Sequence, residues 1–407
     1  MTFPFGFSLG NPGDPGGSNE SGMPNPLAGA QFFAELQKLL SWQGGPVNWD
    51  LAKQIASTAL DGEVRPSIGE SSQIDDALRL ADVWLNPVTD LPSGIVRTAA
   101  WSRQEWLNGT MAAWGRLCDP VAQRMVAALS TLLPAEALEG VGPLSGVVEQ
   151  FGGIVFGAQV GHGLAGLAAE VLGSTDIGLP LASPGLAVLL PANVKAFGEG
   201  LERPEEEIRL YLALREAAHH RLFGHVSWLS QLVLEAVDAY ARGIHFDGEA
   251  LQAAMSEIDP TDPSSMQQLV EGSLFTPEDT PEQAAALRRL ETLLALIEGW
   301  VDTVVSAAAS EHMPGAAALR EATRRRRASG GPAEQTFATL VGLDLRPRRL
   351  REAATLWEAV GSLQGIDKRD AVWSHPDLLP TAEDLDDPIG FAERVGADPM
   401  AGFDFPE

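Results

Sequence analysis

The chain has 407 residues, of which 45% are hydrophobic and 20% charged, a composition that supports a sizeable core and excludes wholesale disorder. Its 28 basic and 55 acidic residues give a net charge of −27, which repels phosphate backbones and anionic lipid, so we expect no nucleic-acid partner. The single cysteine, Cys118, excludes an intramolecular disulfide and a four-cysteine zinc site, and it favours a reducing, cytoplasmic setting.

Residues 1–27 are rich in Gly and Pro, and we expect them to form a flexible leader. They contain no Lys, no Arg and no apolar core, so they do not have the pattern of a secretory signal peptide. The most apolar stretch, at about 144–172, is interrupted by polar and charged residues. We therefore expect no membrane span.

The spacing of apolar residues predicts a mostly α-helical protein. Helical patterning begins at about residue 28, and Pro and Gly punctuate the segments that follow. The Gly-rich stretch 140–203 contains an apolar run after Pro184 that predicts a short strand or extended segment. The further predicted helices cover about 47–61, 72–86, 97–116, 119–133, 204–223, 227–242, 281–310, 315–327, 333–341 and 347–363.

We interpret residues 28–376 as one helical domain, which could divide into an N-terminal part 28–140 and a motif-bearing part 141–376. The segment 377–407 is acidic and contains several prolines, so we expect an irregular tail. Basic residues concentrate in 320–351, including Arg324–Arg327. We favour a solvated helix face that balances the acidic tail over a surface for nucleic acid or an acidic partner.

The helix at 204–223 carries the frame Arg215-Glu216-Ala217-Ala218-His219. Zinc peptidases use a helical HExxH, because residues i and i+4 share a face and the intervening Glu acts as general base. Here the base and second-ligand positions are filled, but Arg215 holds the first-ligand position. A guanidinium has no acceptor lone pair, so Arg215 cannot bind zinc.

A second candidate is Glu298, which lies inside the apolar run 293–301 and precedes Gly299. A carboxylate in a buried helix needs a cation or a metal as partner. The sequence leaves open whether Glu298 pairs with a cation such as Arg215 or serves as a third metal ligand. Gly299 removes a side chain and predicts close approach by another helix.

Segments 214–229 and 296–305 resemble the zincin-like family of bacterial hydrolases described as zinc-dependent metalloproteases, one branch of which is named for association with deazaflavin-cofactor biosynthesis. Active members carry HExxH, then Phe, then Pro-Trp-Leu, and later Leu-Glu-Gly-His. The resemblance covers most of the chain and implies a mostly α, zincin-like metallopeptidase fold with few or short strands. It implies Glu216 as the general base and His219 and Glu298 as metal ligands. The matching positions are Glu216, His219, Phe223, Trp228, Leu229, Ile297, Glu298 and Gly299.

The sequence departs from this family pattern at Arg215, at Ser227 in place of Pro, and at Trp300 in place of His. Catalytic zinc sites rely on three protein ligands, so losing one weakens metal binding. His225 is a candidate substitute ligand, because it falls where another zincin class places its third His. In the competing arrangement, the planar guanidinium of Arg215 pairs with Glu298 where the metal would have been.

Two functions follow from these alternatives. In the first, which we favour, the chain is a family member with a degenerate motif, catalytically weak or inactive, that binds an unidentified protein or peptide partner or acts as a scaffold. In the second, it is an active zinc-dependent peptidase that uses a substitute ligand. The sequence supports zinc and no metal equally, and it specifies neither a substrate nor an oligomeric state.

Overall fold

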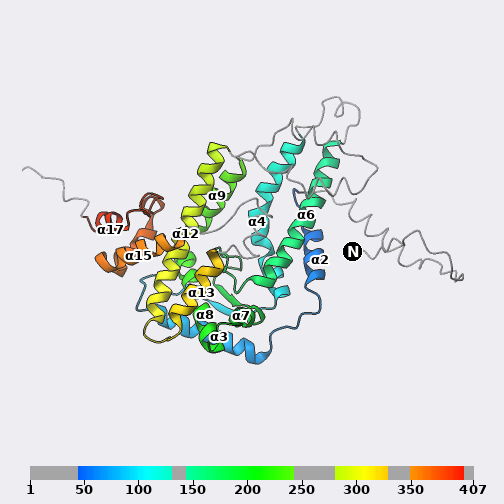
Figure 1. Ribbon diagram of the computed structural model, residues 1–407. Helices are drawn as coiled ribbons and strands as arrows, with labels where there is room; N and C mark the ends of the chain where they lie inside the picture. Colours follow the sequence, from blue (N-terminus) through cyan, green and yellow to red (C-terminus); the bar gives the residue numbers. More distant parts are fainter. Residues whose placement is uncertain (1–44, 131–143, 243–279, 329–348, 398–407) are drawn as a thin grey trace, which may run out of the picture. The chain divides into compact units, whose positions relative to one another are not determined.

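The computed structural model describes residues 45–130, 144–242, 280–328 and 349–397 (Figure 1). All of them belong to one compact unit, residues 44–407, and the second unit, residues 1–43, lies outside the described residues. The predicted leader 1–27 and the helix expected at 333–341 also fall outside them. The leader, the division at residue 140 and the tail boundary stay predictions.

The described chain is mostly α-helical, as predicted. Its two strands, β1 (Arg97–Ala100) and β2 (Leu186–Leu189), pair in parallel with Arg97 opposite Leu186. The expectation of few, short strands is therefore confirmed. The helices are α2 (Trp49–Ala59), α3 (Ile68–Leu85), α4 (Arg103–Ser130), α6 (Leu144–Glu170), α7 (Pro191–Gly198), α8 (Glu205–His225), α9 (Leu229–Arg242), α12 (Pro281–Ala309), α13 (Ala316–Ala328), α15 (Leu350–Gln364), α16 (Ile366–Ala371) and α17 (Pro388–Gly396), with short 3-10 turns at Val372–Ser374 and Pro376–Leu378.

Helix α8 packs against α3, α7, α12, α13 and β2. Its first turn carries Glu205, Glu206 and Glu207, which complement the positive end of the helix dipole. After these residues almost every side chain is buried, from Ile208 to Leu222. A helix surrounded on all sides by other elements buries its polar side chains as well, so each of them needs a partner inside the protein.

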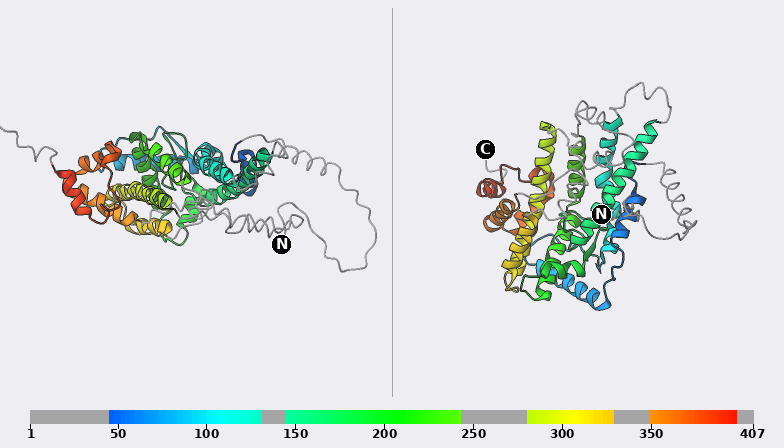
Figure 2. Two further views of the ribbon diagram at one scale, coloured as in Figure 1. Left: turned by 90° about the horizontal axis from the view of Figure 1, so that it is seen from above. Right: turned by 45° about the vertical axis from the view of Figure 1, so that its right-hand side comes forward.

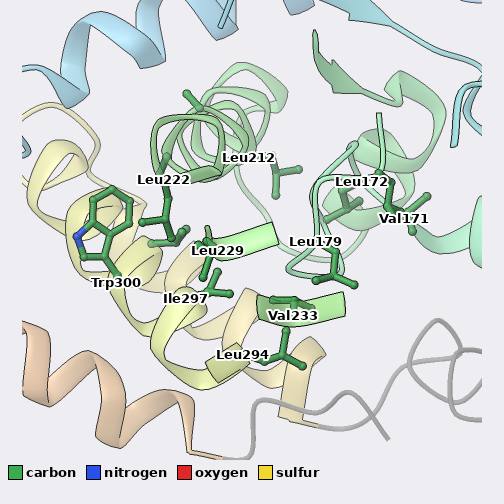
Figure 3. Packing of buried hydrophobic residues seen from close by; sticks show 14 of the residues in the cluster. Val171, Leu172, Leu179, Leu212, Leu222, Leu229, Val233, Leu294, Ile297 and Trp300 are labelled. Atoms are coloured by element: carbon green, nitrogen blue, oxygen red, sulfur yellow. The ribbon is translucent and has the colours of Figure 1, made fainter. Parts of the chain in front are cut away.

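Helix α12 supplies the other half of the central packing. Thr280 caps its first turn through a hydrogen bond from the backbone N–H of Gln283, and Pro281 occupies the first helical position. Figure 3 shows Ile297 and Trp300 of α12 beside Leu222 and Leu229 in the buried apolar cluster. This packing fixes α12 beside α8 and so positions the polar residues that both helices carry.

Helix α15 packs against α12, and the views in Figure 2 show the orange helix segment beside the yellow one. A Cβ atom added at Gly299 would lie 2.7 Å from both Ala353 Cβ and the backbone nitrogen of Ala354. The predicted close approach of another helix at Gly299 is therefore confirmed.

Two predicted elements are wrong. Residues 97–116 and 119–133 were expected as two helices, whereas 97–100 form β1 and a single helix, α4, runs from Arg103 through Pro120 to Ser130. The strand forms because β2, almost 90 residues later in the chain, offers it a partner. Pro120 removes one backbone donor without ending α4, which packs against α6 and α9.

The acidic tail also differs from its prediction. Residues 388–396 form α17, which packs on α15, and Asp387 caps its N-terminus through a hydrogen bond from the backbone N–H of Gly390. The tail is therefore not irregular throughout.

By length and composition, α12 is apolar enough to cross a membrane, and it is the one such helix in the described ranges. However, 83% of its most apolar window is buried inside the protein, as in the core helix of a globular fold.

Candidate metal centre

The motif residues meet between α8 and α12. Arg215 and His219 lie four residues apart and therefore share one face of α8, which points toward Glu298 in the middle of α12. Arg215 Nη2 lies 2.5 Å from Glu298 Oε2, and His219 Nε2 lies 3.0 Å from Glu298 Oε1. All three residues are at most 5% exposed. The three positions that correspond to metal ligands in the family pattern, Arg215, His219 and Glu298, thus form one buried cluster.

A fourth member of the cluster, Arg327, comes from α13. Its Nη2 atom lies 3.0 Å from Glu298 Oε1 and also donates a hydrogen bond to the backbone carbonyl of Asp176. The side chain of Arg327 is 4% exposed. Both oxygens of Glu298 are therefore engaged by cationic or hydrogen-bonding side chains from two helices.

Arg327 was not among the predicted site residues, because we expected Arg324–Arg327 to form a solvated helix face. That interpretation is wrong for three of the four residues. Arg324 lies 2.5 Å from buried Asp302, and Arg326 lies 2.9 Å from Asp176.

The spacing of the arginines contained a usable signal. Arg320, Arg324 and Arg327 recur at i, i+4 and i+7, so they share one face of α13. The first two bind Asp302 and the third binds Glu298, whereas Arg325 is 76% exposed. The apolar helix α12 carries two buried carboxylates, Glu298 and Asp302, which are the acidic partners that such a row of arginines requires.

The electrostatics follow from this geometry. Burial alone would raise the pKa of Glu298, but Arg327, Arg215 and His219 together lower it well below its ordinary range. Burial likewise opposes the charge of Arg215, yet Glu298 raises the pKa of Arg215 above its ordinary value. Glu298 is therefore a charged carboxylate at neutral pH, held by guanidinium groups that stay charged.

The ring of His219 has an acceptor on each side. Its Nδ1 atom lies 2.8 Å from the carbonyl oxygen of Arg215, and its Nε2 atom faces Glu298. Each ring nitrogen of His219 therefore faces an oxygen atom of the protein, and neither is directed at open space where a metal could bind.

Glu216 points away from Glu298, toward the loop that precedes β2. Burial raises the pKa of its carboxyl, but His220 and the hydroxyls of Ser174 and Thr175 lower it below the ordinary value. A fixed carboxylate with a lowered pKa is a weak base. Its donors are Ser174 N at 3.2 Å, Ser174 Oγ, Thr175 N at 3.1 Å, Thr175 Oγ1 at 2.6 Å and Val188 N at 3.1 Å.

Little open space adjoins these groups. A cavity of about 20 Å³ is lined by Arg215, Glu216, His219 and Arg327, and it has room for about one water molecule. The loop at Gly178 covers Glu298, because a Cβ atom added at Gly178 would lie 3.1 Å from Glu298 Oε1. This cavity is too small for a peptide substrate.

The residues do not fit a zinc ion. Within the described ranges, no three His, Cys, Asp or Glu side chains are grouped so that they could hold a metal. Arg215 and Arg327 direct N–H groups at the carboxylate that zinc would need. His225, the candidate substitute, lies six residues beyond His219, about 9 Å along α8. It is exposed and its Nε2 atom is 3.1 Å from the carbonyl oxygen of Ser93.

Trp300, at the position of the family's second-helix His, has a structural contact. Its Nε1 atom donates to Asp370 Oδ1 at 2.9 Å. Asp370 also accepts from Thr89 Oγ1 and from Arg369, so Trp300 links α12 to α16 and to the turn after α3. A residue in this network is turned away from Glu298.

The fold and the pairing of an ExxH helix with a glutamate on a second helix define a metallopeptidase-like protein. Residues 47–392 match the model of the zincin-like metallopeptidases, and the chain belongs to this family. Its fold is similar to the crystal structure of a "putative hydrolase with a novel fold" from Chloroflexus aurantiacus, with a TM-score of 0.59 and 21% identity over 86% of this chain and 99% of that one. No curated protein matches the sequence.

Proposed function

We propose that this protein is a member of the zincin-like family that works without a catalytic zinc, by binding a protein or peptide partner rather than by hydrolysis. The observation that carries the proposal is the occupation of Glu298 by Arg215 and Arg327, at 2.5 and 3.0 Å. A metal at this place would have to displace two guanidinium groups from Glu298 and replace the contact between His219 and Glu298.

The positions of the other motif residues support the same proposal. Glu216, the general-base position, is held by hydroxyl and backbone donors and does not face Glu298. The adjoining cavity of about 20 Å³ is too small to accommodate a peptide substrate. A zinc peptidase needs the metal, an available base and an open coordination position in one accessible place.

The cluster has a clear structural task in this proposal. Arg215 lies on α8, Glu298 on α12 and Arg327 on α13, so the ion pairs hold three helices in one register. Removing one partner of such a buried pair leaves an uncompensated charge and costs about 3–5 kcal/mol. The degenerate motif is then a scaffold element in place of a reaction centre.

Metal content measured by elemental mass spectrometry, on protein purified without an affinity tag and incubated with zinc, tests the proposal. We expect close to no zinc per folded chain and no chelator-sensitive cleavage of a peptide library. One zinc per chain together with such cleavage would overturn the proposal and restore the peptidase hypothesis.

A restoration experiment separates the roles of the two arginines. Arg215→His alone recreates HExxH but leaves Arg327 on Glu298, so we expect little zinc binding. The double variant Arg215→His/Arg327→Gln removes both competitors, and we expect a large gain in zinc affinity in equilibrium dialysis. Arg215→His/Arg325→Gln is the matched control, because Arg325 is exposed. Equal zinc binding by all three variants would show that Arg327 does not compete for the site.

A further inference from the structure

A larger cavity opens on a different face of α8 from the Glu298 cluster. Its volume is about 260 Å³, and it is bounded by α4, α8, α9 and the segment 179–185. Figure 3 places two of its wall residues, Leu179 and Val233, within the buried apolar cluster. The walls are mainly apolar, with side chains from Ala113, Leu117, Leu179, Leu181, Phe223 and Val233. Apolar walls with a few polar groups are typical of a small-molecule site.

The buried polar group in this cavity is His220. It is 7% exposed, and its Nε2 atom lies 3.4 Å from Glu216 Oε1 without forming a hydrogen bond. Its Nδ1 atom has no hydrogen-bond partner among the described residues. Because Nε2 faces the Glu216 carboxylate, the ring has room for a ligand at Nδ1, where a polar group of the ligand would supply a hydrogen-bond partner.

A second polar group, Arg116, lines the same cavity from α4. Its side chain is exposed, and it forms neither an ion pair nor a hydrogen bond within the described part of the chain. A guanidinium can bind a carboxylate through two parallel hydrogen bonds. The hydroxyl of Ser230, on α9, also lines the cavity and has no partner within the described ranges.

We infer that this cavity binds a small apolar carboxylic acid, with its carboxylate held by Arg116 and His220 and its apolar body against Leu179 and Val233. A cavity of about 260 Å³ is slightly smaller than the usual range of small-molecule sites, so we expect a ligand with on the order of ten non-hydrogen atoms. An amine of the same size would meet the charge of Arg116 and is excluded. The inference goes beyond the proposed function and does not depend on whether the Glu298 cluster holds zinc.

Octanoate is a suitable probe, with octylamine and octanol as comparison ligands of equal length. We expect octanoate to bind the full chain in isothermal titration calorimetry and to raise its Tm, because a ligand that binds only the folded state stabilises it. We expect octanol to bind at least about tenfold more weakly and octylamine not to bind. Equal affinity for octanoate and octanol, or no binding of octanoate, would overturn the inference.

Variants locate the binding site. Arg116→Gln removes the cation, and we expect octanoate affinity to fall about tenfold or more. Arg124→Gln is the matched control, since Arg124 is exposed on the same helix and does not line the cavity. Ser230→Phe fills the cavity without breaking a contact within the described residues, and we expect it to abolish binding. An unchanged affinity in both Arg116→Gln and Ser230→Phe, with Tm values near that of the parent protein, would place octanoate elsewhere.

Discussion

Glu216 on α8 and Glu298 on α12 are two buried glutamates, and the protein compensates their charges by different means. Glu298 is surrounded by full positive charges on Arg215 and Arg327. Glu216 accepts hydrogen bonds from hydroxyl and backbone donors of Ser174, Thr175 and Val188. Both carboxyls have lowered pKa values despite burial.

The difference shows how each carboxylate is tied to the fold. Cations on α8 and α13 can compensate Glu298 only if these helices and α12 keep their relative positions, so that contact links distant elements. The donors to Glu216 come from one loop and one strand, and neutral donors leave no unpaired charge when the carboxylate is lost. We therefore expect substitutions around Glu298 to lower the free energy of unfolding more than substitutions around Glu216.

The largest effect should follow from breaking the charge cluster. Arg215→Ala leaves Glu298 with an incomplete set of partners in a buried setting, and we expect the free energy of unfolding to fall by about 3–5 kcal/mol in urea titration. Arg325→Ala, on the exposed face of α13, should change it by less than about 0.5 kcal/mol. A loss below about 0.5 kcal/mol for Arg215→Ala would contradict the structural role of the pair.

Acid should weaken the protein through the same carboxylates. The pKa values of Glu298, Glu216 and Asp176 are lower in the folded state than the ordinary values of 4.5, 4.5 and 3.8. The unfolded chain therefore takes up protons first as the pH falls. Their stabilising contribution is complete above about pH 4.5 and is lost as the pH falls toward the lowered values.

Urea unfolding between pH 6 and pH 3 measures this acid effect. We expect a continuous decline in the free energy of unfolding below about pH 4.5 and a shallower decline in Glu298→Gln. Identical pH profiles for the two proteins would show that Glu298 does not contribute to the acid sensitivity.

A smaller effect is expected at the second carboxylate. Glu216→Gln retains one acceptor oxygen but turns an amide NH₂ toward backbone and hydroxyl donors, so we expect a loss of about 1–3 kcal/mol in thermal or urea unfolding. Glu206→Gln, at the exposed start of α8, should cost less than about 1 kcal/mol. If Glu216→Gln proved more damaging than Glu298→Gln, the comparison between the two carboxylates would be reversed.

The smallest effect concerns the packing that positions α12. In Gly299→Ala the new methyl would overlap Ala353 and Ala354 of α15, and we expect a net loss of about 1–2 kcal/mol, because overpacking outweighs the gain in helix propensity. Gly115→Ala is the matched control, since the nearest atom would be Asp119 Oδ2 at 3.9 Å. It should leave the protein unchanged or stabilise it by up to about 1 kcal/mol. Equal Tm shifts in the two variants would contradict the tight contact at Gly299.

Much of the fold could be predicted from the sequence because its signals are local. The apolar stripe of 281–310 and the glutamates after Pro204 identified the cores of α12 and α8. β1 escaped prediction, because Arg97–Ala100 form a strand only through pairing with β2. The uninterrupted course of α4 through Pro120 likewise depends on its packing against other helices.

The candidate site, like the fold, has features that the sequence predicted and features that it did not. The i, i+4 spacing placed Arg215 and His219 on one face, and the isolation of Glu298 in an apolar helix required a partner there. The sequence could not choose between the partners of Glu298, because a metal and a guanidinium answer the same electrostatic need. It also could not assign Arg327 to Glu298 or orient Glu216 toward Ser174.

By itself, the sequence determined the helical class of this protein, its resemblance to the zincin-like family and the replacement of the first metal-ligand histidine by Arg215. Only the tertiary structure decided that Arg327 completes the cluster, that Glu216 faces the loop before β2, and that His220 borders a separate cavity. The physical reason is the distance along the chain over which each kind of interaction acts. Periodicity and residue chemistry act within a few turns of helix, whereas the compensation of a buried charge depends on which distant helices the packed core brings within 3 Å.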